Sequence, residues 1–130
     1  MTIPEFEELC LRQFDRLPAW LQEKLDNVDI VIEDEPTRAQ LREHGMRRGD
    51  DLLGLYEGIS LVERGVDYMG ALPDKITVFC APHLRAAEED GEPLEEIVYD
   101  TLMHEIGHHL GFDEDEILRI EAERRERRKG

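Results

Sequence analysis

The sequence predicts a single domain that combines several helices with a few β-strands. The chain has 130 residues, a length typical of one domain with one hydrophobic core. Residues 4–16 and 92–110 place apolar side chains at helical spacing. Three short apolar stretches between them predict strands. We find no internal repeat and no linker to a second domain, so residues 1–130 are expected to form one unit.

The first half of the chain is expected to hold three helices and one strand. Each of the first two predicted helices, at 4–16 and 18–25, begins with a proline. Proline lacks an N–H group, and residues in the first turn of a helix do not need one for a hydrogen bond within the helix. Residues 28–34 are mostly β-branched and predict a strand. A threonine in the N-cap position predicts a short helix at 37–43.

Two further strands are expected in the middle of the chain, at 52–59 and 75–80. In the first of them, Gly54 and Gly58 mark bulges or places where backbone approaches backbone closely. The connection at 60–74 is long for a structureless loop, and we expect it to flank an active-site cleft.

Residues 83–90 predict a short helix that ends at a glycine, with His83 as a surface or a helix-start residue. Glutamate and proline then begin the long helix at 92–110. His109 falls within the apolar face of that helix. We therefore interpret it as a buried histidine that holds the helix to the core or bonds to its neighbours.

The long helix carries an HExxH motif from His104 to His108. Residues four apart lie on the same face of a helix, so the two imidazoles can converge on one metal ion. Glu105 projects about 100° further round, where a base can take a proton from water without occupying a ligand position. Gly111, just beyond the helix end, permits the left-handed turn that redirects the chain.

A catalytic zinc ion normally takes three protein ligands, so a third ligand is expected after this turn. Glu114 has the spacing of the last residue in HExxHxxGxx(D/H) sites and is the first choice. Asp113 is the second choice, since a shift of one residue in the turn would present it instead. A competing interpretation is that the carboxylates at 113–116 only complement the dipole of a last helix.

With these motifs in view, the chain resembles the small bacterial zincin-like metallopeptidases. The resemblance covers nearly the whole chain, including 17–18, 33–36, 53–58, 72–79 and 104–111, and the last stretch is the most specific. It implies an α+β fold in which a small twisted β-sheet packs on the HExxH helix, with helices on its flanks. It also implies a Zn²⁺ cofactor bound by His104 and His108, with Glu105 as general base. Similar proteins usually carry Asp or His where this chain has Glu114.

The first functional hypothesis is therefore a zinc-dependent hydrolase that cleaves peptide bonds. Its substrate would be a peptide or protein that pairs in extended form with an exposed strand edge, for which we expect residues 75–80. Candidates for stabilising the oxyanion are Tyr56, Tyr68 and Tyr99.

Two other functional hypotheses fit the same residues. Residues 111–113 also resemble part of the metal motif of zinc-binding endoribonucleases that mature ribosomal RNA. Those enzymes use three histidines and lack a counterpart of Glu105. A metal-binding protein without turnover of its own is the third hypothesis.

The charge of the chain disfavours certain classes of binding partner. The chain has 32 acidic and 16 basic residues, a net charge of −16, which disfavours nucleic acid and anionic membranes. The basic run at 119–130 is interpreted as a solvated, ion-paired helix end.

No apolar run approaches membrane-spanning length and no signal peptide is evident, so a soluble cytoplasmic protein is expected. Cys10 and Cys80 are expected to be free, buried thiols. The oligomeric state is left open.

Overall fold

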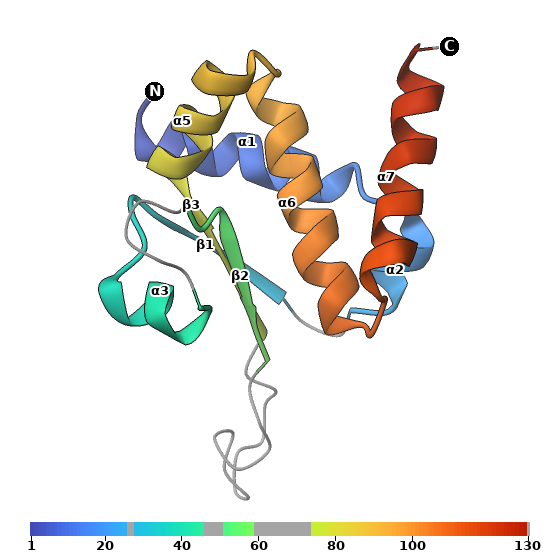
Figure 1. Cartoon of the computed structure of the whole chain (residues 1–130), viewed down its shortest axis with the longest axis horizontal. Helices are drawn as coiled ribbons and strands as arrows, with labels where there is room; N and C mark the ends of the chain where they lie inside the picture. The colour runs from blue at the N-terminus through green and yellow to red at the C-terminus, as the bar shows by residue number, and fades with distance from the viewer. Residues whose placement is uncertain (26–27, 46–50, 59–73, 130) are drawn as a thin grey trace, which may run out of the picture.

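A computed structural model describes residues 1–25, 28–45, 51–58 and 74–129, so most of the connection expected at 60–74 lies outside the described residues. The elements, shown in Figure 1, are α1 (Ile3–Asp15), α2 (Ala19–Glu23), β1 (Val28–Glu33), α3 (Arg38–Glu43), β2 (Gly54–Glu57), β3 (Asp74–Phe79), α5 (Cys80–Asp90), α6 (Leu94–His109) and α7 (Glu114–Lys129). The α+β prediction is confirmed. In the described ranges, no helix is both long enough and apolar enough to cross a membrane.

The three strands form a mixed sheet in the order β1-β3-β2. β3 runs parallel to β1 and antiparallel to β2. Because β3 is central and paired on both sides, the expectation that residues 75–80 offer an exposed edge is wrong. The edge strand that contacts α6 is β2. The order of the strands depends on tertiary contacts, which the local sequence does not reveal.

Alternation along β3 divides the core between the two faces of the sheet. Ile76 and Val78, both fully buried, face the main core formed with α1 and α6. Phe79 faces the other side, where it clusters with Leu55 and with Leu41 of α3. Figure 1 shows α6 lying across the first of these faces, with α1 behind it. The sheet therefore supports the HExxH helix from one side.

Several boundaries differ from the sequence prediction, among them the start of β2, which is Gly54 and not residue 52, and two boundaries beside prolines. Cys80 begins α5 instead of ending the strand, so Pro82 lies in the first turn of that helix. Proline is tolerated there because N–H groups in the first turn have no acceptor within the helix, so the helix loses no hydrogen bond. α6 begins at Leu94, with Pro93 as its N-cap. As predicted, Cys10 and Cys80 are free and buried.

His83 is fully buried, so the prediction of a surface position is wrong, whereas its predicted place at a helix start agrees with its position near the start of α5. Its Nδ1 lies 2.8 Å from the carbonyl oxygen of Phe79, and its Nε2 lies 2.9 Å from the hydroxyl of Thr101. Burial lowers the pKa of His83, against the effect of the Phe79 carbonyl. This neutral, hydrogen-bonded imidazole joins the start of α5 to the middle of α6.

Gly54 allows β2 to approach α6 closely. A Cβ atom at this position would lie 2.7 Å from Cγ2 of Thr101 and 3.3 Å from the backbone oxygen of Thr77. We expect Gly54→Ala to lower the free energy of unfolding by about 1–3 kcal/mol, the usual cost of overpacking. Urea unfolding of both proteins measures the difference.

A double variant gives the control. Thr101→Ser removes the Cγ2 atom but keeps the hydroxyl, so it should restore part of the stability lost in Gly54→Ala. Additive losses in the double variant would show that this contact does not set the distance between β2 and α6.

The end of α6 forms the predicted turn. Gly111 has a φ of +91°. The N–H of Gly111 donates to the oxygen of His108 (3.0 Å) and that of Phe112 donates to the oxygen of Gly107 (2.9 Å). This pair of bonds is a Schellman motif, which ends the helix and sends the chain back. Figure 1 shows α7 returning beside α6 in the opposite direction.

Candidate metal centre

His104 and His108 point towards the same place beside the last turns of α6. Their Nε2 atoms lie 3.1 Å apart, and their rings meet edge to face with centroids 4.6 Å apart. His104 is partly buried, whereas His108 is exposed. The helix thus brings the two predicted ligands together through the i, i+4 spacing alone.

This separation suits a zinc ion. Zn–N bonds of 2.0–2.1 Å at a tetrahedral angle place two ligand nitrogens about 3.3 Å apart. The observed 3.1 Å between the Nε2 atoms is close to that value. The two imidazoles therefore fit a shared metal ion with only a small change in their side-chain torsions.

Glu105 lies between α6 and β2. Its Oε1 accepts a hydrogen bond from the backbone N–H of Tyr56 at 3.2 Å. Burial raises the pKa of Glu105, while that hydrogen bond and the nearby imidazoles of His104, His108 and His44 act in the opposite direction. A carboxylate held in this way is oriented by the sheet and remains next to the histidine pair.

The structure describes the side chain of one of the two candidates for the third ligand, Asp113. Asp113 caps α7, because its Oδ1 accepts a hydrogen bond of 2.8 Å from the N–H of Glu116. The side chain of Glu116 lies 3.4 Å from the N–H of Asp113 in return, which completes a capping box. Asp113 is exposed and already has this structural role.

Glu114 is the first residue of α7, but its side chain lies outside the described residues. Within the part of the chain that the structure describes, no group of three histidine, cysteine or acidic side chains converges on one point. The assignment of Glu114 therefore remains a prediction.

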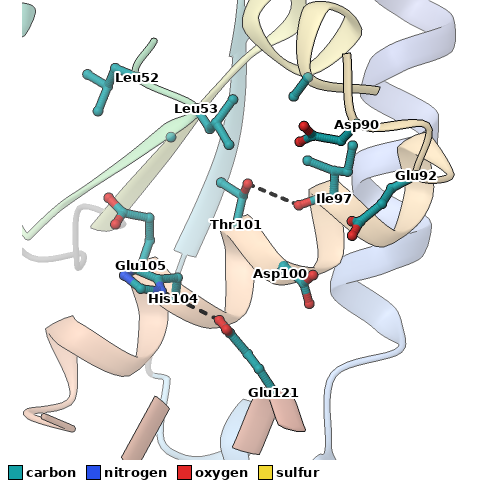
Figure 2. Close-up of a pocket in the computed structure, with 12 residues that line it drawn as sticks. Leu52, Leu53, Asp90, Glu92, Ile97, Asp100, Thr101, His104, Glu105 and Glu121 are labelled. Atoms are coloured by element: carbon teal, nitrogen blue, oxygen red, sulfur yellow. Dashed lines mark hydrogen bonds and ion pairs between the residues drawn. The ribbon is translucent and has the colours of Figure 1, made fainter. Parts of the chain in front are cut away.

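Glu121 is a carboxylate beside the site that the sequence analysis did not identify. It lies on α7, and its Oε1 is 3.5 Å from Nδ1 of His104. Figure 2 shows the two side chains facing each other between α6 and α7. Sequence patterns give no direct signal for it, since it lies within a run of charged residues. Only the antiparallel return of α7 brings Glu121 to the HExxH motif.

His109 is exposed, so the expectation that it is buried in the apolar face is wrong. It does bond to its neighbours. Its ring stacks on Tyr56 with centroids 3.9 Å apart, and its Nε2 lies 3.6 Å from Oδ2 of Asp74. The Tyr56 hydroxyl donates to the same carboxylate oxygen at 2.9 Å. These contacts fix Tyr56, whose backbone N–H orients Glu105.

The other oxyanion candidates differ in position. Tyr68 lies outside the described residues. Tyr99 is buried in the core, and the guanidinium of Arg16 lies 5.5 Å from its ring centroid. Of the two tyrosines that the structure describes, Tyr56 contacts Glu105 directly, through its backbone N–H.

A cavity of about 380 Å³ opens beside these residues. Its walls include Leu52, Leu53, Ile97 and Thr101, and its polar part contains carboxylates and the imidazole of His104 (Figure 2). The lining carboxylates are Asp90, Glu92, Asp100, Glu105 and Glu121. The cavity thus joins an apolar wall to the HExxH residues.

Comparisons with known proteins indicate the family of this chain. A family model for zincin-like metallopeptidases matches residues 25–124, which include the whole HExxH motif. A solved structure, a conserved hypothetical protein from Thermo thermophilus, is 26% identical with a TM-score of 0.56, covering 84% of this chain and 94% of that one. No curated protein matches. The extent of the family match shows that this chain belongs to the zincin-like metallopeptidase family.

Proposed function

We propose that the protein is a zinc-dependent peptidase. The observation that carries this proposal is the convergence of the His104 and His108 Nε2 atoms to 3.1 Å, with the oriented carboxylate of Glu105 beside them. Neighbouring imidazoles alone would suit many metal proteins. The added base makes hydrolysis the best-supported chemistry.

His104, His108 and Glu114 would hold the zinc ion. When bound, zinc supplies a Lewis acid that polarises a carbonyl group and makes a water molecule more acidic. Glutamate in place of the usual aspartate or histidine is compatible with this role, since its carboxylate is also a zinc ligand.

Glu105 would act as the general base. Its carboxylate accepts a proton from the attacking water as the oxygen adds to the scissile carbonyl carbon. The same proton then passes to the amide nitrogen, so that the C–N bond breaks and an amine leaves. Holding Oε1 on the Tyr56 N–H keeps the carboxylate in place for both transfers.

β2 is the strand edge that we propose for substrate binding. The Tyr56 N–H points away from β3 and towards Glu105, so the outer edge of β2 faces the catalytic side of α6. An extended peptide that pairs with an edge strand receives backbone hydrogen bonds that are independent of its sequence. Such pairing would place a peptide bond of the substrate close to Glu105.

The cavity beside the site would then accept one side chain of the substrate. Leu52, Leu53 and Ile97 provide an apolar wall, and Asp90 and Glu92 provide negative charge. No lysine or arginine lines the cavity among the residues that the structure describes. A lysine or arginine side chain, with an aliphatic stem and a cationic end, suits this combination.

A mixture of peptides with varied sequences tests the proposal, with the cleavage sites identified by mass spectrometry. We expect cleavage that is lost after treatment with a zinc chelator and restored by added Zn²⁺. Among the cleaved peptides, lysine or arginine should be enriched beside the scissile bond and aspartate or glutamate depleted. Cleavage that persists in the metal-stripped protein would contradict the proposed function.

A further inference from the structure

Glu121 is unusual among the residues of α7. This helix, Glu114–Lys129, is rich in charged residues, and several of its side chains are exposed. The Glu121 side chain is only 12% exposed, and its Oε1 lies 3.5 Å from Nδ1 of His104. A partly buried carboxylate costs free energy unless a partner compensates for its lost hydration. The partner seen here is a predicted metal ligand.

The packing of α7 on α6 places Glu121 in this position. A Cβ atom on Gly107 would lie 3.1 Å from Cγ1 of Ile117, so the glycine leaves room for that fully buried side chain. Glu121 follows Ile117 by four residues and therefore lies on the same face of α7, one turn further along. His104 precedes Gly107 by about one turn on the antiparallel helix. The same contact thus brings the carboxylate to the histidine.

We propose that Glu121 is a positioning residue for His104. Its carboxylate accepts a hydrogen bond from Nδ1–H of His104, which fixes the ring and leaves the lone pair of Nε2 for the metal ion. This inference rests on the proposed function, because it gives His104 the role of a metal ligand.

The hydrogen-bond network around His104 is consistent with one tautomer. If Nδ1 of His104 carries the proton, its Nε2 is an acceptor, and Nε2–H of His108 can donate to it across the observed 3.1 Å. Metal-binding histidines commonly donate their second N–H to a carboxylate, which fixes the tautomer and strengthens the ligand. Because Nδ1 and Nε2 lie on different sides of the ring, Glu121 contacts the side turned away from His108. It therefore acts through His104.

The test compares Glu121→Met with the wild-type protein. Methionine has a similar length but lacks the carboxylate that accepts the hydrogen bond from Nδ1–H. Glu126→Met is the matched control, since it removes the same charge from an exposed position on the same helix. Glu121→Gln is a second variant that keeps the shape and a weaker, neutral acceptor. Two quantities are measured: the His104 tautomer in the metal-free protein, from long-range ¹H–¹⁵N spectra at alkaline pH, and the zinc dissociation constant, by chelator competition.

In the wild-type protein we expect the Nδ1–H tautomer of His104. Glu121→Met should shift His104 towards Nε2–H and weaken zinc binding about 10–100-fold, the usual effect of losing such a partner. Glu121→Gln should give a smaller loss of the same sign, and Glu126→Met should leave both quantities unchanged.

Three results separate the inference from the proposed function. An unchanged tautomer together with unchanged zinc affinity in Glu121→Met would overturn the positioning role and leave the proposed function standing. A shifted tautomer in a protein that binds no zinc would support the positioning role and overturn the proposed function. Complete loss of a wild-type zinc site in Glu121→Met, with the tautomer unchanged, would make Glu121 a ligand and overturn the inference.

Discussion

Replacing Glu105 with glutamine is expected to lower kcat for peptide cleavage about 10²–10⁴-fold, the range by which a positioned general base accelerates a reaction. The amide cannot accept the proton of the attacking water. Its oxygen can still accept the hydrogen bond from the Tyr56 N–H that now holds the carboxylate at 3.2 Å. Initial rates on a peptide that the wild-type protein cleaves provide the measurement.

The matched control is Glu95→Gln, because Glu95 is exposed on the same helix and loses the same charge. Its kcat should equal that of the wild-type protein. Zinc affinity should persist in Glu105→Gln, since Glu105 is not assigned as a ligand. A Glu105→Gln protein with the wild-type kcat would show that another group accepts the proton.

Replacing Glu114 with alanine is expected to weaken zinc binding about 10²–10³-fold. Four-ligand structural zinc sites bind with about 10–16 kcal/mol, which corresponds to about 2.5–4 kcal/mol for each ligand. Glu114 begins α7 directly after the Gly111 turn, at the spacing expected of the third ligand. The zinc dissociation constant, obtained by chelator competition, measures the loss.

Asp113→Ala is the comparison that distinguishes the two candidate ligands. It removes the acceptor of the 2.8 Å hydrogen bond from the Glu116 N–H. We therefore expect a loss of about 0.5–2 kcal/mol in the free energy of unfolding, as for other N-caps, with nearly unchanged zinc affinity. If Asp113→Ala lost the zinc and Glu114→Ala kept it, the two assignments would have to be exchanged.

The features that the sequence predicts correctly depend on short-range geometry. The i, i+4 spacing of His104 and His108 determines their approach, whatever the rest of the fold does. Gly111 ends α6 because a left-handed residue is needed there. Residues 28–34 predict a strand because β-branched side chains suit an extended backbone, and β1 is found there.

The errors concern contacts between segments that are distant in the chain. The position of β3 in the centre of the sheet depends on pairing with β1 and β2 together. The burial of His83 depends on a hydrogen bond to Thr101, eighteen residues away in the sequence. Glu121 reaches His104 only because Ile117 packs against Gly107. No local pattern carries this information.

A calorimetric zinc titration of the metal-stripped protein tests the central claim most directly, with the His108→Ala variant titrated beside it. The 3.1 Å approach of the His104 and His108 Nε2 atoms predicts one tight site per chain, strongly weakened in the variant. Absence of a tight site in the wild-type protein would contradict the account, as would a site whose affinity does not change in His108→Ala.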